Sequence, residues 1–290
     1  MLVAHLSDLH CAAAADAVWL DRQLDRIAAR GVDHLAITGD LLDRWDPQLL
    51  DRILDLLERR DLLQADRLTI LHGNHDLASS GGHPRGGADL VRLALRFWDP
   101  PPLAARRRER FYDTISRRAP RVALRAPFLK TLTSGARVAV LDTVPLLWRP
   151  LQFEGRTVAI RHAIGCIRPA QARWLAGVTP GGAPLIVLMH HYPLGTPSFQ
   201  WTPPRGSRLP IRAVRVPMHI PEPGCGVFWE AAAAARVRAV LCGHVHRARL
   251  DWHDGVAVGL NGQSGAAWAG RTIAYYDISD EEIRMQTEKT

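Results

Sequence analysis

An α/β fold with a layered, parallel sheet is predicted by two features of the first part of the chain. Short apolar runs alternate with segments whose apolar residues recur at helical spacing, and polar side chains follow each apolar run. Strands that alternate with helices in this way favour a parallel sheet with right-handed crossovers. The carboxyl ends of such strands meet at one edge of the sheet, so the polar side chains are expected to gather there.

Each element of this first part can be placed from its pattern. Strands are expected at residues 2–6, 34–38 and 68–71, and two connecting helices at residues 16–30 and 47–59. Asp16 is a possible N-cap of the first helix, and Gly31 marks its end. Both helices carry one apolar stripe, which predicts that one face of each packs on the sheet.

The rest of the chain is expected to complete a single domain, residues 1–290, with two irregular regions. Residues 79–137 are expected to form a cap or insertion. They begin with a Gly-rich loop at 79–87, and the run Asp99-Pro100-Pro101-Pro102 then separates two helical patterns, at 88–98 and 103–118. Residues 194–226 are expected to form a Pro- and Arg-rich loop. Further strands are expected at 137–141, 157–160, 184–189, 237–241, 255–260 and 272–278, and helices at 169–176 and 228–236. The last two strands are expected to be antiparallel and to close the second half of the core.

The composition narrows the class of protein. The chain has 290 residues, of which 47% are hydrophobic and 23% charged, as in water-soluble globular proteins. No apolar run approaches the ~20 residues needed to cross a bilayer, and the N-terminus lacks the basic leader and cleavage site of a signal peptide. The cysteines are scattered without CxxC spacing, which argues against a disulfide framework or a cysteine zinc site. These features predict a cytoplasmic protein.

Five strand ends carry side chains of the kind that bind metal ions. They are Asp8 with His10, Asp40, Asn74 with His75, His190, and His244 with His246. Carboxylates and imidazoles are ligands of mid-series divalent metals, and thiolates are missing from the pattern. Any one of these residues alone would be an ordinary cap, turn residue or core histidine. Their recurrence at one strand end after another of an α/β frame predicts a common site.

The number of donors predicts two ions rather than one. Seven or eight side chains exceed what one tetrahedral or octahedral ion needs, which favours two ions ~3.5–4 Å apart, bridged by a carboxylate. Residues two apart in a strand point the same way, so Asp8 and His10 can bind one ion together. The same holds for His244 and His246, unless a tight turn directs them to two ions. The expected ions are Mn²⁺, Fe²⁺ or Fe³⁺, or Zn²⁺.

With these blocks in order, the sequence resembles the calcineurin-like metallophosphoesterases. The blocks are Asp8-x-His10, Gly39-Asp40, Gly73-Asn74-His75-Asp76, His190 after a strand, and Gly243-His244-x-His246. The resemblance implies a four-layer α/β/β/α sandwich. It also implies that Asp40 bridges two ions, one held with Asp8, His10 and His246, the other with Asn74, His190 and His244. His191 is the alternative to His190, since the doublet leaves the register open.

Metal-dependent hydrolysis of a phosphate ester is the activity that the resemblance implies. Two divalent ions acidify a shared water to a bridging hydroxide, which attacks the phosphorus in line. His75 is outside the ligand set, and the resemblance places it over the phosphate, where it stabilises charge or protonates the leaving oxygen. Asp76 is expected to orient the ring of His75, as carboxylates do for catalytic imidazoles.

The charge of the chain predicts an anionic substrate. The net charge is +8, and no acidic residue occurs between Glu154 and Glu222. Arginine binds phosphate, and aromatic rings stack on bases or touch acyl chains. The candidate substrate contacts are therefore four residues of the loop 194–226: Phe199, Trp201, Arg205 and Arg208. A solvated Arg-rich loop is the alternative, and the basic run at 106–110 is expected to be the exposed face of a helix.

Three functions are compatible with these features. The favoured one is a phosphodiesterase that acts on a small nucleotide-like or glycerol-type diester. The second is a hydrolase of a larger anion, either nucleic acid or a lipid-linked phosphate, reached through the Arg-rich loop. The third is a non-catalytic scaffold that uses the metal fold for protein binding, and the intact pair His75-Asp76 argues against it.

Overall fold

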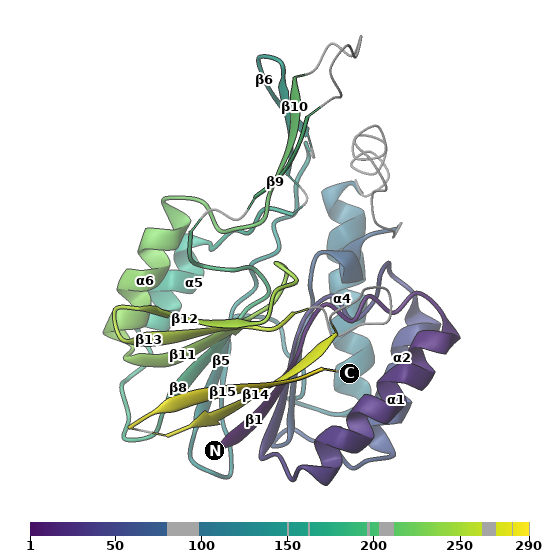
Figure 1. Ribbon diagram of the computed structural model, residues 1–290, viewed down its shortest axis with the longest axis vertical. Coiled ribbons are helices and arrows are strands. Elements are labelled where there is room, and N and C mark those ends of the chain that lie inside the picture. The colour runs from purple at the N-terminus through teal and green to yellow at the C-terminus, as the bar shows by residue number, and fades with distance from the viewer. Residues whose placement is uncertain are drawn as a thin grey trace.

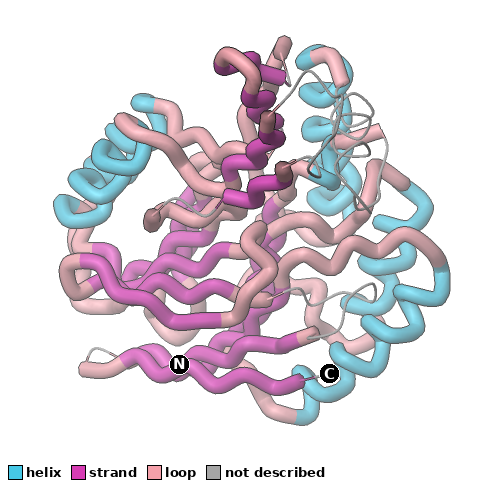
Figure 2. The backbone as a smooth tube through the Cα atoms, turned by 45° about the horizontal axis from the view of Figure 1, so that its top comes forward, coloured by secondary structure: helices cyan, strands magenta, loops and turns pink. Residues whose placement is uncertain are grey.

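The described residues form three β-sheets with helices on the outside of two of them (Figure 1). The structure is a computed structural model and describes residues 1–79, 99–149, 151–161, 163–195, 198–202, 212–262, 271–279 and 281–289. Two large sheets pack face to face. The third, smaller sheet projects beyond them at one end, as the tube in Figure 2 also shows.

The first sheet has the strand order β15-β14-β1-β2-β3. Its parallel strands are β1 (Leu2–Leu6), β2 (His34–Thr38) and β3 (Leu68–Leu71), with the bounds predicted from the apolar runs. β14 (Thr272–Ile278) pairs antiparallel with β1, and β15 (Ile283–Lys289) pairs antiparallel with β14. The expectation that 272–278 closes the second half of the core was therefore wrong, because this strand continues the first sheet.

The second sheet has the strand order β12-β13-β11-β8-β5-β4. Its four central strands are parallel: β5 (Arg137–Val140), β8 (Leu185–Leu188), β11 (Val237–Cys242) and β13 (Val256–Leu260). The two edge strands, β4 (Phe128–Thr131) and β12 (Arg249–His253), are antiparallel to their neighbours. The strand predicted at 255–260 thus forms, but it is parallel to β11, its neighbour towards the centre of the sheet.

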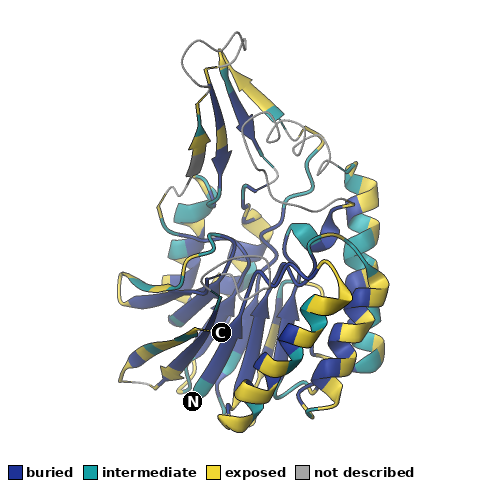
Figure 3. Ribbon diagram, turned by 45° about the vertical axis from the view of Figure 1, so that its right-hand side comes forward, coloured by how far each residue is buried: buried dark blue, intermediate teal, exposed yellow. Residues whose placement is uncertain are grey.

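Apolar clusters define four layers, α/β/β/α, as predicted. The outer face of the first sheet packs against α1 (Ala14–Ala29), α2 (Pro47–Glu58) and α4 (Pro101–Arg118). The outer face of the second sheet packs against α5 (Pro169–Ala176) and α6 (Gly224–Ala234). A third cluster lies between the sheets, where Val3 and Ala36 meet Val140 and Leu188. In Figure 3 the strands are mostly buried, while the helices expose their outer faces.

Three helix starts differ from the expected ones, and one of them is that of α6, which begins at Gly224 rather than at residue 228. α1 begins at Ala14, and Asp16 lies inside its first turn, where its carboxylate accepts hydrogen bonds from the N–H groups of Ala12 and Ala13 at 2.9 Å. α4 begins at Pro101, since proline is tolerated in a first turn, where its missing N–H removes no helical hydrogen bond. None of the described helices is long and apolar enough to cross a membrane.

The described part of the range 79–137 contributes to the core, which differs from the expected cap. α4 buries Phe111, Tyr112 and Ile115 in the same cluster as α1 and α2. β4 is an edge of the second sheet. The many arginines of α4 hide its apolar stripe in the sequence. The helical pattern expected at 88–98 lies outside the described residues.

The third sheet has the order β6-β7-β10-β9 and includes part of the range predicted to be a loop. Its strands are β6 (Leu151–Glu154), β7 (Thr157–Ile160), β9 (Ser198–Trp201) and β10 (Ala213–Pro217). β9, β10 and the first turn of α6 lie within residues 194–226, so this range is not simply a loop. β10 forms because Val214 and Val216, on either side of Arg215, point to the same face and pack with Ile160 of β7.

Replacing Phe111 by alanine tests whether α4 belongs to the core. Phe111 is fully buried, so Phe111→Ala should lower the free energy of unfolding by about 3–5 kcal/mol, the usual effect of such a cavity. Leu103→Ala, on the same helix but at a 41% exposed position, is the control and should cost under about 0.5 kcal/mol. Urea unfolding followed by circular dichroism measures both. An equally small loss in the two variants would show that α4 is a detachable cap.

Candidate metal centre

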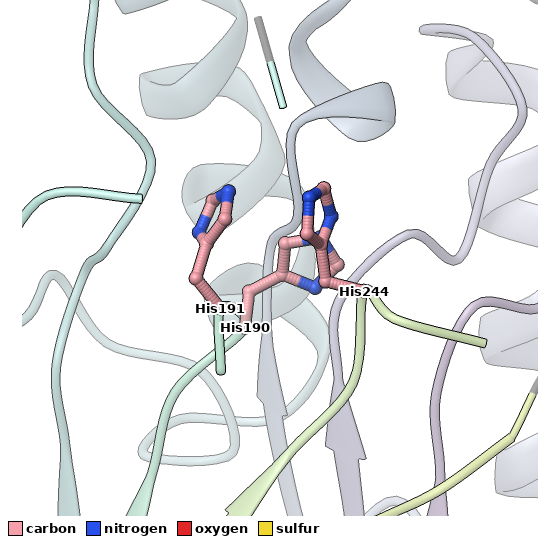
Figure 4. Close-up of side chains that lie close together, drawn as sticks. All are labelled: His190, His191 and His244. Atoms are coloured by element: carbon pink, nitrogen blue, oxygen red, sulfur yellow. The ribbon is translucent and has the colours of Figure 1, made fainter. Parts of the chain in front are cut away.

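The seven predicted metal ligands lie together at the edge where the parallel strands of both large sheets end. The first sheet contributes Asp8 and His10 after β1, Asp40 after β2, and Asn74 after β3. The second sheet contributes His190 after β8, and His244 and His246 after β11. Figure 4 shows the rings of His190 and His244 beside each other, with His191 next to them. Both sheets therefore build one site.

The backbone is left-handed at most of these ligands. Among the residues that the structure describes, nine non-glycine residues have a positive φ, and five of them are Asp8, His10, Asp40, His244 and His246. Such conformations cost of order 1–3 kcal/mol each and persist where the surroundings hold them, often at functional sites. The strained turns direct five donor side chains into one space.

Two glycines are required because the ligand loops approach each other closely. A Cβ atom at Gly73 would overlap the Asp40 carboxylate, and one at Gly243 would overlap Ser7 and Asp8. Gly243 also donates its N–H to the His190 carbonyl at 3.0 Å, which joins the ends of β11 and β8. Glycine before Asn74 and before His244 is thus a condition for assembling the site.

The first group of donors surrounds Asp8. The Nε2 atom of His246 lies 3.3 Å from Asp8 Oδ1, and that of His10 lies 3.9 Å from it. The two Nε2 atoms of His10 and His246 are 3.2 Å apart. Two nitrogens at 2.0–2.1 Å from one ion are about 2.8–3.4 Å apart at 90–109°, so this spacing fits shared coordination.

The second group of donors surrounds His190. Its Nε2 atom lies 3.1 Å from Asn74 Oδ1 and 3.1 Å from His244 Nδ1. Asp40 Oδ2 is 3.4 Å from this atom and 3.8 Å from the Nε2 atom of His10 in the first group. Asp40 therefore stands between the two groups, where a bridging carboxylate is expected.

Backbone carbonyls fix the orientation of two of these imidazoles. His190 Nδ1 is 2.8 Å from the carbonyl oxygen of Thr38, and His244 Nε2 is 2.7 Å from that of Ala163. Each of these nitrogens must carry the proton that it donates. The opposite nitrogens, His190 Nε2 and His244 Nδ1, then present lone pairs to each other and to Asn74 Oδ1. Three electron-rich atoms that converge in this way fit a metal ion.

The electrostatics of the buried carboxylates also fit a cation. Asp8 and Asp40 are at most 1% exposed. Burial opposes their ionisation, yet the imidazoles, chiefly His246 for Asp8 and His190 for Asp40, hold the pKa of each carboxyl below its usual range. Burial likewise opposes protonation of His190, but Asp40 raises the pKa of His190 to about 9, so a metal ion at Nε2 would replace a proton that the carboxylate otherwise attracts there. Buried anions need a compensating positive charge, which metal ions supply.

His75 lies at the outer margin of the site, and Asp43 orients it. The His75 side chain is 12% exposed, and its Nδ1 atom is 3.0 Å from the Asp43 carbonyl oxygen and 3.6 Å from the Asp43 carboxylate. Burial would lower the pKa of His75, but Asp40 and Asp43 together raise it to about 9. His10, Asp40 and His75 also converge closely enough to hold an ion.

Asp76 has a different role from the expected one. Its carboxylate accepts hydrogen bonds from the N–H groups of Leu42 and Gly73, at 2.9 and 2.8 Å, and so ties the loop after β2 to the loop after β3. The expectation that Asp76 orients His75 was wrong, because backbone donors engage both Asp76 oxygens. Asp43 orients His75 instead. Burial raises the pKa of Asp76 to about 6.

The predicted substrate contacts are only partly within the described residues. Arg205 and Arg208 lie outside them, as does the side chain of Phe199. Trp201 is in β9, paired with Val214, and packs on the apolar face of the third sheet.

Three contributors to the site were missed in the sequence. Asp43 follows Asp40 by three residues, and a second carboxylate at that distance was an available signal. The carbonyls of Thr38 and Ala163 carry no sequence signal, because every residue has one.

A family comparison agrees with this geometry. Residues 1–248 match the model of the calcineurin-like phosphoesterases, and the chain therefore belongs to that family. The activity class of this family is metal-dependent hydrolysis of phosphoric esters. No functionally curated protein matches the chain significantly in sequence.

Solved structures share the fold at low identity. A dimetal phosphatase from Danio rerio aligns with a TM-score of 0.61 and 11% identity, over 100% of this chain and 96% of that chain. The protein TT1561 of Thermus thermophilus aligns with a TM-score of 0.55 and 12% identity, over 98% of this chain and 97% of that chain. At these identities the likeness concerns the fold.

Two aspartates of one loop provide a matched test of the site. Asp40→Ala should reduce binding to at most one Mn²⁺ per chain, because Asp40 contacts both donor groups. Asp43→Ala should still bind two ions at saturating Mn²⁺ but lose part of the roughly 10²–10⁴-fold effect of a general acid, since His75 loses its orienting carboxylate. Metal analysis after dialysis, with steady-state kinetics, measures both effects. Equal metal loss in the two variants would contradict these assignments.

Proposed function

We propose that the protein is a binuclear, metal-dependent phosphodiesterase acting on a small nucleotide-like or glycerol-type diester. The observation that carries the proposal is the convergence of the lone pairs of His190 Nε2, His244 Nδ1 and Asn74 Oδ1 beside the buried carboxylate of Asp40. This arrangement suits hard or borderline divalent cations.

The residues divide into two ligand sets that share one carboxylate. One ion would be held by Asp8, His10, Asp40 and His246, and the other by Asp40, Asn74, His190 and His244. Mn²⁺, Fe²⁺ or Fe³⁺, and Zn²⁺ all suit these donors. When bound, two such ions would lower the pKa of a water molecule and neutralise phosphate oxygens.

His75 is proposed to act on the leaving group. Its partly exposed ring and its contact with Asp43, which lies outside both ligand sets and also raises the pKa of His75, support a protonated imidazole at the entrance of the site. Asp43 holds Nδ1, which leaves Nε2 to donate a proton to the departing ester oxygen.

A diester is favoured over a monoester because the third sheet adjoins the metal ligands. Ala163, just beyond β7, contacts His244 through its carbonyl and also packs in the apolar cluster of the third sheet. A sheet so placed can contact the second organic group of a diester, which a monoester lacks. Trp201, with Phe199, Arg205 and Arg208, is proposed to make these contacts.

A larger anionic substrate is the second candidate. Trp148, shortly before β6, and Phe153 of β6 are 65% and 71% exposed, and Arg215 of β10 is 46% exposed. Exposed rings in the same region as an arginine, here ion-paired with Glu154 at 3.7 Å, suit single-stranded nucleic acid or the headgroup of a lipid-linked phosphate. A non-catalytic scaffold is the third candidate, and the oriented His75 weighs against it.

We also place the protein in the cytoplasm. All four cysteines, Cys11, Cys166, Cys225 and Cys242, are free thiols. This is the usual state in a reducing compartment.

A substrate panel tests the proposal. With Mn²⁺ present, bis-p-nitrophenyl phosphate, 2′,3′-cyclic nucleotides and a glycerophosphodiester should be cleaved with higher kcat/KM than p-nitrophenyl phosphate. Single-stranded DNA and vesicles carrying a phospholipid are assayed beside them. Preference for either would favour the second candidate, and no hydrolysis of any ester would favour the scaffold.

His75→Ala should reveal the general acid through the leaving group. The variant should bind two Mn²⁺ ions and lose roughly 10²–10⁴ in kcat on an alkyl diester, the usual contribution of a general acid. The loss should shrink for p-nitrophenolate, which needs little protonation. Rate constants over a series of leaving groups measure this, and an equal loss throughout would replace proton donation by charge stabilisation.

The double change Arg205→Ala and Arg208→Ala tests the proposed substrate contacts. It should raise KM for the preferred diester and leave kcat unchanged, as expected for lost uniform binding. A minimal chromogenic diester has little beyond its phosphate to bind and should be unaffected. Unchanged KM for every substrate would show that these arginines are solvated.

A further inference from the structure

Asp142 is a buried acid at the same edge as the metal ligands, although it belongs to neither donor group. It follows β5 and is 7% exposed. Its Oδ1 atom accepts a hydrogen bond from the N–H of Val144 at 3.0 Å and lies 3.3 Å from His72 Nε2. Its Oδ2 atom accepts hydrogen bonds from Arg108 at 2.8 Å and Arg168 at 3.2 Å. The carboxylate is thus fixed from four sides.

The backbone of Asp142 is fixed as well. The Gln171 side chain accepts a hydrogen bond from the Asp142 N–H and donates one to the Asp142 carbonyl, both at 2.8 Å. Gln171 is 2% exposed and lies in α5. A buried residue clamped at both its backbone and its side chain is a rigid reference point for neighbouring loops.

On one side, Asp142 holds the loop that carries Asn74. His72 precedes Gly73 and Asn74, and its second nitrogen, Nδ1, is 2.8 Å from the hydroxyl of Tyr112 in α4. α4 adds Arg107, which donates to the Leu77 carbonyl at 2.8 Å, just beyond His75. The side chains of Arg107 and Arg108 are only 11% and 19% exposed, so the basic run at 106–110 is not simply a solvated helix face.

On the other side, Thr143 holds the loop that carries His190. Its Oγ1 atom accepts the N–H of His191 at 3.1 Å, and its hydroxyl proton can then be donated to His191 Nδ1 at 2.9 Å. Thr143 and His191 are at most 1% exposed. This contact engages Nδ1 of His191, while Nε2 of His190 lies beside Asn74 Oδ1 and Asp40 Oδ2, which favours His190 as the ligand. Thr143 therefore determines where the His190-His191 segment lies.

We infer that Asp142 and Thr143 form a positioning pair for the second ion. They connect the loop of Asn74 to the loop of His190, whose donor atoms must lie 3.1 Å apart. The pair connects the loops after β3 and β8. Three ligands belong only to the first ion, and they follow β1 and β11 instead: Asp8, His10 and His246. The pair should therefore tune the affinity of the second ion selectively. The inference rests on the two-ion site of the proposed function.

Equilibrium dialysis against Mn²⁺ tests the inference. Thr143→Val removes the hydroxyl while nearly keeping the shape, and should weaken one of two bound ions by about 10–100-fold, as observed for groups that orient metal ligands. The other ion should change by less than about twofold. Asp142→Asn should act in the same direction, and Thr143→Ser should restore wild-type binding.

A matched control separates this effect from general destabilisation. Thr133 follows β4, and it donates hydrogen bonds to the Asp66 carboxylate from its N–H, at 2.6 Å, and from its hydroxyl. Asp66 precedes β3, so this contact lies at the edge of the sheets opposite to the metal ligands. Thr133→Val should leave both Mn²⁺ affinities unchanged. Urea unfolding of the two valine variants shows whether they remain folded to the same degree.

Site-specific backgrounds identify which ion is weakened. In a His246→Ala protein, which retains the second ligand set, adding Thr143→Val should lower Mn²⁺ affinity by about 10–100-fold. In an Asn74→Ala protein, which retains the first set, it should change little. Equal effects in both backgrounds, or none, would overturn the inference. A wild-type protein that binds only one Mn²⁺ would instead refute the two-ion site itself.

Discussion

Two buried carboxylates, Asp8 and Asp40, impose the constraint on which the rest of the structure depends. They lie at most 1% exposed at the meeting point of two sheets, where an uncompensated charge would be costly. Because solvent does not reach these carboxylates, groups inside the protein must compensate their negative charge, and imidazoles surround both of them. Since two of those imidazoles direct lone pairs inward, the centre still lacks positive charge in the neutral state of the histidines. Metal ions satisfy that requirement, and the same charge makes the centre attractive to a phosphate ester.

The constraint is met at the expense of local stability. Five of the predicted ligand residues adopt left-handed backbone conformations, each costing of order 1–3 kcal/mol, which together approach the net stability of a typical domain. Ordinary packing must offset this strain. The apolar cluster between the sheets and the two outer clusters provide it, with parallel strands that are buried on both faces. The turns that carry the predicted ligands can therefore be strained, because the strands that precede them are unstrained and well packed.

The contrast between well-packed strands and strained turns explains which parts of the fold and the site could be predicted from the sequence. Strands β1, β2 and β3 were predicted with their observed bounds, because apolar runs end abruptly in polar ligands. The ligand types were visible for the same reason. Asp43 and Asp142 were not assigned roles, since a single carboxylate has many uses and only tertiary contacts reveal its partner. The strand at 157–160 was predicted, but the third sheet to which it belongs was not, because Pro and Arg surround the other short strands. The helix at 103–118 was predicted as well, but its place in the core was not, because its buried residues are few among arginines.

The placement of the ligands couples the metal centre to the packing of the two sheets. Asp40 and Asn74 come from the first sheet, while His190 and His244 come from the second, so an ion held by all four, as proposed, would cross-link the layers at one edge. Away from this edge the layers are joined by the apolar contacts of the cluster between them and by hydrogen bonds such as those from Lys130 to the carbonyls of Ala65 and Leu68. A shift of one sheet against the other would separate Asp40 from His190, now 3.4 Å apart, before it disrupted either sheet. Metal binding and inter-sheet packing therefore stabilise the same arrangement, as linkage requires of a ligand that binds only the folded state.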